Sequence, residues 1–408
     1  MAAAVESLIS VGQAQEMILG SVQPGPTVTV PLRSALGRTL AERVVCDIDF
    51  PPFNRAMMDG YAVRAADVAT VPAALQVVGR VAAGAVAERA VEPGEAMQIN
   101  TGAPIPPGCD AVVRVEDTQT DGNRVVVRVV ASAGRFVARR GEYVRAGAAV
   151  LEPGVCLGAG QIAIAATAGR TSLSVYERPD VAILVTGDEL VEPGVLPTGG
   201  QIRDSNRYVL DGLIDRSGGR PVDLGLVRDD PEALKDKIRT GLATGFLCIT
   251  GGVSMGEFDF VPQCVTECGA TVRFHKLALK PGKPTLFATT DDGACVFGLP
   301  GNPVSVFATF WLLVRPALAV RQGRPPAVPR PVAARLEGRV GPTADRQTYR
   351  PARVHPHVDG RLVAEPLVWH GSGDPFGLAV CNAMIVTAPG SPARGPGDTI
   401  EVLLIEVP

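Results

Sequence analysis

The sequence has few of the residue patterns that hold metals or disulfides. Its eight cysteines stand singly among 408 residues, no C-x-x-C pair occurs, and Cys264 and Cys268 have no matching pair nearby. The four histidines are not paired at metal-ligand spacing either. We therefore expect reduced thiols, a cytoplasmic location, and neither a zinc site nor a disulfide framework.

The chain also lacks an excess of basic residues and long apolar runs. It has 39 lysines and arginines against 42 aspartates and glutamates, which argues against nucleic acid as the main partner. The apolar run "VFATFWLLV" stops at Arg315, short of the roughly 18 residues of a membrane span, so we expect none. Residues 1–20 carry Glu6 and Glu16 and no basic segment, which is typical of an amphipathic helix and not of a signal peptide.

What the chain does contain is enough apolar material for several packed domains. Hydrophobic residues make up 46% of the sequence and charged residues 20%, a balance that excludes global disorder. At about 150 residues per domain, the length predicts two to four domains. The 46 glycines and 35 prolines indicate many turns.

The hydrophobic pattern changes along the chain. After a helical and then extended start, residues 46–146 hold short valine-rich strands, with a hairpin signal at Asp121-Gly122-Asn123. From residue 179 apolar strands alternate with helices, which predicts a parallel, doubly wound α/β sheet. Within it, Asp230 is the expected N-cap of a helix that begins at Pro231. A proline-rich linker at 323–331 precedes a final β-rich segment.

Three glycine-containing loops follow predicted strands of the α/β segment. They are "TGDEL" at 186–190, "TGGVSMGEFD" at 250–259 and "GLPGNPVS" at 298–305. Ligands of open α/β sheets bind outside the carboxyl ends of the strands, and glycine lets backbone N–H groups approach them closely. Gly251, Gly252 and Ser254 are therefore candidate ligand-binding residues. The third loop leads into a helix N-terminus, which favours an anion.

Two common nucleotide motifs are absent from these loops. Gly251 and Gly256 have the G-x-x-x-x-G spacing of a nucleoside-triphosphatase loop, but Glu257 stands at the position of the required lysine. No G-x-G-x-x-G opens a helix after a strand, so a Rossmann dinucleotide site has little support.

A pair of lysines flanks a predicted turn in "HKLALKPGKPTLF". Pro281 and Gly282 fit the central positions of a type II turn, which would hold the Cα atoms of Lys280 and Lys283 within about 7 Å. Two ammonium groups this close repel each other unless an anion lies between them. The alternative is an exposed turn with solvated lysines.

Carboxylates also gather at or after the predicted strand ends. They are Asp188, Glu189, Asp229, Asp230, Glu257 and Asp259. Acids beside an anion site favour Mg²⁺, which is commonly held by one or two carboxylates and by phosphate oxygens of a substrate. The pattern predicts a phosphorylated ligand with Mg²⁺. For single residues a structural role is the alternative, since Asp230 fits an N-cap and Asp188 fits a turn.

Ten stretches of the sequence together resemble the MoeA family of molybdenum cofactor biosynthesis, which includes the gephyrin E domain. They stand in the family's order and extend across nearly the whole chain. The stretches are "FNRAMMDGYAV" (53–63), "NTGAPIPPGCDAVV" (100–113), "RRGE" (139–142), "TGDEL" (186–190), "GQIRDSNR" (200–207), "VRDDP" (227–231), "TGGVSMGEFDF" (250–260), "LKPGKP" (279–284), "GLPGNPVS" (298–305) and "HGSG" (370–373).

This resemblance implies a multidomain fold of α/β and β parts. The implied domains are an elongated, discontinuous domain I, a small β-rich domain II, a doubly wound α/β domain III that binds molybdopterin, and a C-terminal β-barrel as domain IV. On this chain they correspond to 1–45 with 147–178, to 46–146, to 179–327 and to 328–408. The family's homodimers place the active site between domain III of one chain and domain II of the other.

The resemblance also implies a reaction. MoeA-like enzymes insert molybdate into adenylylated molybdopterin, with a divalent cation, and release AMP. The implied molybdate donors are Lys280, Lys283, Ser305, Arg350 and Ser372, with Lys276 nearby. Asp259 and Glu189 would hold Mg²⁺ with support from Asp229, and Asp59 would be the acid contributed across the dimer. Catalysis would then consist mainly of positioning and charge neutralisation.

Structural roles are the alternative for several of these residues. Ser305 could be a first-turn helix serine, Ser372 and Asp59 turn residues, and Arg350 a solvated strand arginine. The chain departs from the family at Tyr143, where "RRGE" is often followed by aspartate, so one domain II acid is missing.

Two other functions compete with the transferase. A non-catalytic scaffold like gephyrin is compatible with Tyr143, but it would not need to keep Lys280, Asp259 and Ser372 together. A molybdopterin adenylyltransferase like the single-domain relatives of the α/β unit is disfavoured by the flanking domains and by "HGSG".

Overall fold

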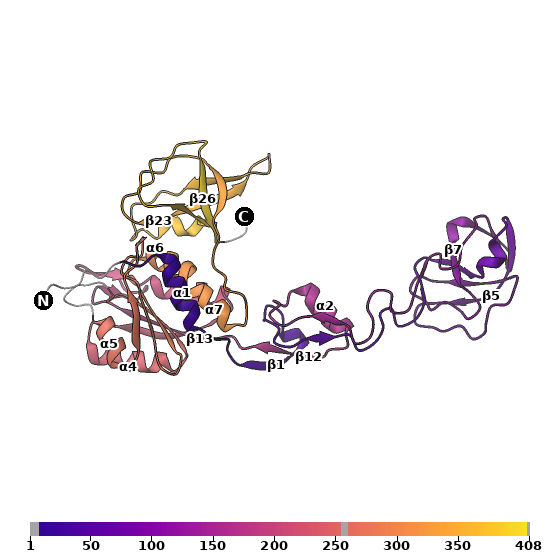
Figure 1. The fold of residues 1–408 in the computed structure, drawn as a ribbon, viewed down its shortest axis with the longest axis horizontal. Coiled ribbons are helices and arrows are strands. Elements are labelled where there is room, and N and C mark those ends of the chain that lie inside the picture. Colours follow the sequence, from indigo (N-terminus) through magenta and orange to yellow (C-terminus); the bar gives the residue numbers. More distant parts are fainter. Residues whose placement is uncertain (1–7, 254–259, 406–408) are drawn as a thin grey trace.

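The computed structural model describes residues 8–253 and 260–405. The molecule is elongated: an α/β unit carries the C-terminal barrel, and a narrow arm leads away from it to a small β unit at the far end (Figure 1). The chain enters and leaves the far unit through this arm. The arm therefore contains one segment that precedes the far unit in the sequence and one that follows it.

The α/β unit is built on a six-stranded sheet. Its order is β16 (Arg220–Val227), β13 (Asp180–Thr186), β17 (Phe246–Thr250), β21 (Cys295–Leu299), β20 (Leu286–Thr289) and β18 (Thr271–His275). The first four strands are parallel, as predicted. The predicted parallel arrangement does not extend to β20, which pairs antiparallel with both β21 and β18 and so runs opposite to the other five strands of this sheet. A short turn joins β20 to β21, and in it the Thr290 N–H donates to the Ala294 carbonyl at 3.0 Å. Two strands joined by so short a connection run antiparallel, because parallel strands need a longer crossover.

Helices cover both faces of the sheet. They are α3 (Asn206–Arg216), α4 (Pro231–Leu242), α5 (Val261–Glu267), and a continuous helical run of α6 (Pro303–Thr309), the π-helical turn η4 (Phe310–Val314) and α7 (Arg315–Arg321). Asp230 caps α4 as predicted, since its carboxylate accepts from Glu232 N–H at 2.9 Å. By length and composition the run Pro303–Arg321 could cross a membrane, but most of it is buried within this unit, as in the core helix of a globular protein.

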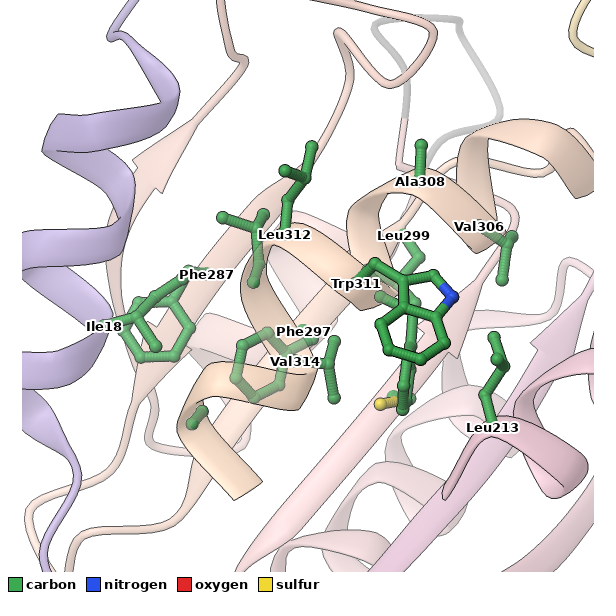
Figure 2. Packing of buried hydrophobic residues seen from close by; sticks show 14 of the residues in the cluster. Ile18, Leu213, Phe287, Phe297, Leu299, Val306, Ala308, Trp311, Leu312 and Val314 are labelled. Atoms are coloured by element: carbon green, nitrogen blue, oxygen red, sulfur yellow. The ribbon is translucent and has the colours of Figure 1, made fainter. Parts of the chain in front are cut away.

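The N-terminal helix α1 (Val11–Ser21) packs against this same core. Ser10 and Gln13 form a capping box that begins the helix. Ile18 points toward Phe287 (Figure 2), and the Gln15 side chain donates to the Leu312 carbonyl of η4 at 2.8 Å. The first helix of the chain is therefore held by the α/β unit.

The arm consists of paired strands with one helix. In it β1 (Thr27–Pro31) pairs with β12 (Ser172–Tyr176), β2 (Val44–Val45) pairs with β11 (Ala149–Leu151), and α2 (Ala159–Thr167) packs alongside. The stretch "GQIAIAATAG" (160–169) predicts a helix with a glycine stop, and α2 confirms it by ending two residues before Gly169.

The far unit is a second six-stranded sheet. Its order is β7 (Ala111–Arg114), β4 (Gly60–Val63), β6 (Glu95–Ile99), β5 (Ala73–Val81), β9 (Arg124–Val127) and β8 (Thr118–Asp121), and β3 (Arg55–Ala56) pairs separately with β10 (Val137–Ala138). The hairpin predicted at Asp121-Gly122-Asn123 joins β8 to β9.

The C-terminal segment forms a closed barrel. Its strands are β22 (Val332–Leu336), β23 (Gln347–Pro356), β24 (Leu362–Pro366), β25 (Ala383–Thr387) and β26 (Thr399–Leu404). Closure follows because β23 pairs with both β24 and β25. In addition β19 (Leu279–Lys280) of the α/β unit pairs with β23, which connects the two units.

Several short elements complete the fold. They are the pair β14 (Leu190–Val191) and β15 (Ile202–Arg203) and the 3₁₀ turns η1 (Leu32–Ser34), η2 (Ala65–Val68), η3 (Val115–Asp117) and η5 (Phe376–Val380). The borders of the four predicted domains stay predictions.

Phe297 allows a test of the α/β core. Its ring is fully buried, 5.1 Å from the Phe287 ring and 6.1 Å from the Phe246 ring, centroid to centroid. We expect Phe297→Ala to lower the free energy of unfolding by about 3–5 kcal/mol, because it leaves a cavity that rigid neighbours cannot fill. Urea unfolding followed by tryptophan fluorescence measures this. The control Phe376→Ala, at a side chain that is 87% exposed, should leave the midpoint unchanged.

Candidate active site

A cavity of about 480 Å³ lies where the barrel meets the α/β unit. Four of the predicted molybdate donors line it together: Lys280, Lys283, Ser305 and Ser372. Lys280 and Lys283 are exposed, whereas Ser305 is buried. Because the described lining residues include two lysines and Arg346 but no aspartate or glutamate, the cavity favours an anion.

The two lysines are held by the strand β19 and the turn that follows it. The Lys280–Pro281 peptide bond is cis, and the predicted type II turn stays a prediction. Gly282 follows with φ +119°, and a Cβ there would come within 2.8 Å of the Leu279 and Thr309 side chains. Glycine is thus required for the turn to lie against α6.

Ser305 and Ser372 meet at the start of α6. The Asn302 side-chain amide donates to Ser372 Oγ at 2.9 Å, and Val304 N–H donates to the Ser372 carbonyl at 3.1 Å. These bonds hold the barrel loop that contains "HGSG" against a helix N-terminus, where N–H groups favour negative charge.

Two predicted residues do not line this cavity. Arg350 lies on β23 and donates from Nη2 to the Gly341 carbonyl at 3.1 Å, and burial lowers its pKa. Lys276 has φ +84°, and its N–H donates to the Thr285 carbonyl at 2.8 Å. The predicted role of each stays a prediction, and Lys276 lies close to the lysine turn, because the Leu277 N–H donates to the Lys283 carbonyl at 2.8 Å.

A second group of predicted residues gathers at the carboxyl ends of β13, β16 and β17. Gly251 has φ +89°, and a Cβ on it would lie 2.0 Å from the Thr186 carbonyl oxygen. Thr186 Oγ1 in turn donates to Asp229 Oδ1 at 2.6 Å. Gly252 lies beside the same threonine, and a Cβ added to Gly252 would lie 3.1 Å from the methyl group of Thr186. In a sheet of this strand order, this edge lies at the topological switch point where ligands bind.

The acids of this edge can offer oxygen ligands to a cation. Glu189 and Asp188 are exposed on the loop after β13, and Asp188 Oδ1 accepts from Asp229 N–H at 3.4 Å. Among the residues that the structure describes, no group of three or more histidines, cysteines or acids converges on one metal position. Mg²⁺ in proteins is commonly held by one or two carboxylates and completed by water and phosphate. Ser254, Glu257 and Asp259 lie outside the described residues.

Asp59 lies in the far β unit, directly before β4 (Figure 1). Its Oδ1 accepts from Thr101 N–H at 2.8 Å and from the Asn100 amide at 3.2 Å. These hydrogen bonds lower the pKa of Asp59 below its ordinary value, the Thr101 N–H most, so the carboxylate stays charged at neutral pH. Within one chain, the structure does not bring Asp59 to the cavity.

Tyr143 occupies the position where the family often has aspartate. Its ring lies 6.1 Å from the Phe50 ring, and the Arg55 guanidinium lies 5.6 Å from the Tyr143 ring centroid. Tyr143 therefore packs against the Phe50 ring and the Arg55 guanidinium at the base of the far unit. An aspartate at this position would instead interact with the guanidinium through its negative charge.

Sequence reasoning missed two residues of the cavity, Arg346 and Trp369. Arg346 directly precedes β23, and Trp369 directly precedes "HGSG". The position of Trp369 beside a predicted motif is a signal that could have identified it. No comparable signal separates Arg346 from Arg350.

Comparisons with known proteins bear on the whole chain. Three family models match it: the MoeA N-terminal region (domain I and II) at residues 9–169, a probable molybdopterin binding domain at 182–320, and the MoeA C-terminal region (domain IV) at 333–405. A relative from Nostoc, named molybdopterin molybdenumtransferase, is 37% identical over 394 residues, which cover 94% of this chain and 89% of the relative. The chain belongs to the MoeA family. The predicted resemblance is therefore confirmed.

Other MoeA relatives agree over the full length. The molybdopterin molybdenumtransferase of Bacillus subtilis is 34% identical, with 97% of this chain and 94% of that protein covered. The crystal structure of the molybdopterin biosynthesis MoeA protein from Pyrococcus horikoshii matches with a TM-score of 0.83 at 30% identity, covering 98% of this chain and all of that chain. The predicted multidomain fold, with an α/β unit and a C-terminal barrel, is confirmed by this match.

Gly251 provides a test of the edge at β17. We expect Gly251→Ala to lower the free energy of unfolding by more than Gly293→Ala does. Gly293→Ala is the matched control. Gly293 has a similar φ of +88° but open space around a new Cβ. The control should cost about 1–2 kcal/mol from the left-handed backbone alone, whereas at Gly251 the Thr186 carbonyl must also move. Thermal unfolding of both variants checks this; equal losses would contradict it.

Proposed function

We propose that this chain is a molybdopterin molybdenumtransferase that inserts molybdate into adenylylated molybdopterin and releases AMP. The main support is the cavity in which Lys280, Lys283, Ser305 and Ser372 meet at a helix N-terminus, without a lining carboxylate among the described residues. A tetrahedral dianion fits these donors. The names of the MoeA relatives support the same reaction.

In this proposal molybdate binds in the cavity between the barrel and the α/β unit. Lys280 and Lys283 supply its counter-charges, and the serines supply neutral donors. Arg346 lines the cavity and can add a guanidinium, in the role that the sequence assigned to Arg350. Positioning and charge neutralisation are then the main contributions to rate, because no protein nucleophile is needed.

The adenylylated molybdopterin would lie along the glycine edge next to β13 and β17. Backbone N–H groups at Gly251 and Gly252 can approach its diphosphate, and Ser254 belongs to the same loop. Glu189 and Asp259 would hold Mg²⁺, with Asp229 in support. Bound there, Mg²⁺ would neutralise negative charge on the diphosphate. Lys276 would add a cation nearby.

A second copy of the chain completes the proposed site. Asp59 lies at the far end of the arm from the cavity of its own chain, and its exposed carboxylate stays charged. A homodimer in which the far β unit of one copy reaches the α/β unit of the other would bring Asp59 to the substrate. We place this dimer in the cytoplasm, because the cysteines are free in the structure.

Release of AMP tests the reaction. The protein is loaded with adenylylated molybdopterin and Mg²⁺, and AMP is followed with and without molybdate. We expect molybdate to trigger release in the wild type and Lys280→Gln to slow it at least about tenfold, since one counter-charge is lost. Lys237→Gln, at an exposed lysine of α4, should behave like the wild type.

The same assay separates the scaffold alternative from catalysis. A wild type that binds the substrate but never releases AMP would be a non-catalytic scaffold. No observation on the described residues or in the comparisons favours that outcome.

Removal of the divalent cation tests the acidic edge. We expect EDTA to abolish molybdate-dependent AMP release and added Mg²⁺ to restore it. Glu189→Gln should require more Mg²⁺ for half-maximal rate, because one carboxylate ligand is lost. Full activity in EDTA would refute the metal requirement.

A further inference from the structure

Trp369 has an unused hydrogen-bond donor at the wall of the cavity. The residue lines the cavity together with Lys280, Lys283 and Ser372. Its indole N–H is shielded from solvent and has no acceptor in the described structure. A buried donor without a partner is unfavourable, and this N–H, unlike that of Trp311 in the apolar core, belongs to a residue beside a cavity that can hold an acceptor.

The loop that carries Trp369 is fixed at several points. Asn302 donates to Ser372 Oγ, as described above, and His370 Nδ1 lies 2.8 Å from Asp374 Oδ2. The backbone on the C-terminal side of the tryptophan is therefore tied to α6 and to its own turn. The remaining freedom lies in the ring, whose torsion about the Cβ–Cγ bond has a broad minimum.

We propose that the Trp369 indole N–H donates a hydrogen bond to the oxyanion bound in this cavity. The inference rests on the proposed function and adds to it a binding residue that charge alone would not identify. Indole nitrogen donates and cannot accept, so its partner must be an atom with a free lone pair. A tetrahedral oxyanion such as molybdate presents such atoms in all directions. Because the N–H is shielded from solvent in this structure, the proposal requires the ring to turn so that the N–H faces the cavity.

A neutral donor is suited to this position. Lys280, Lys283 and Arg346 already supply positive charge, and a further cation would repel them. The indole adds a directional bond without charge, and its ring excludes water from one wall. Loss of such a bond to a charged partner costs about 1.5 kcal/mol, which is close to a tenfold loss of affinity.

The second tryptophan of the chain provides a matched control. Trp311 lies in the α/β core, 6% exposed, and its N–H also has no described partner. Figure 2 shows its ring among apolar side chains. Trp369→Phe and Trp311→Phe thus make the same chemical change, the first at the cavity and the second in the core.

Sodium molybdate binding to the full-length protein tests the proposal by calorimetry and fluorescence. We expect Trp369→Phe to bind molybdate about tenfold more weakly and Trp311→Phe to bind it like the wild type. In the Trp311→Phe protein, which keeps Trp369 intact, molybdate should change the tryptophan emission. In the Trp369→Phe protein it should not.

The outcomes separate this inference from the proposed function. Undiminished binding by Trp369→Phe, or an unchanged emission in Trp311→Phe at saturating molybdate, would overturn the role of Trp369 and leave the cavity as the oxyanion site. If the wild type binds no molybdate, the proposed site itself fails.

Discussion

The contact between the barrel and the α/β unit is the constraint on which the candidate site depends. Leu279 and Lys280 pair with Gln347 and Thr348, and Asn302 binds the Ser372 loop. The apolar side chains of Leu279, Tyr349 and Leu403 belong to one core cluster that continues into the α/β unit. Because this contact fixes both sides of the cavity, the backbone that carries its cationic residues is already in place before any ligand binds.

Much of the fold could be predicted because its signals are local. Continuous apolar strands, helix caps such as Asp230 and the hairpin at Gly122 each act over a few residues. The antiparallel direction of β20 was missed because a parallel and an antiparallel buried strand have the same hydrophobic pattern. The cis bond at Pro281 was missed for a similar reason, because the residue types alone do not distinguish a cis from a trans peptide bond before proline.

The candidate site was predicted less completely, because it joins segments far apart in the sequence. The lysine turn and the "HGSG" loop were identified, but their meeting with Arg346 and Trp369 depends on how the barrel docks. Arg350 illustrates the limit of motif reasoning. On β23 it alternates with Tyr349 and shares a face with Ala352, which is fully buried in the barrel core. Strand periodicity thus places Arg350 on the face of β23 that carries Ala352, and its role as a molybdate donor stays a prediction.

The slender arm has a consequence for the surface of the molecule. A compact monomer of this mass would expose about 15,000 Å². This chain, of 42.5 kDa, exposes 20092 Å², about a third more. Each of its units has an apolar cluster of its own, so the excess does not arise from a missing core. The excess of about 5,000 Å² is larger than the roughly 800 Å² that each partner contributes to an interface of ordinary size.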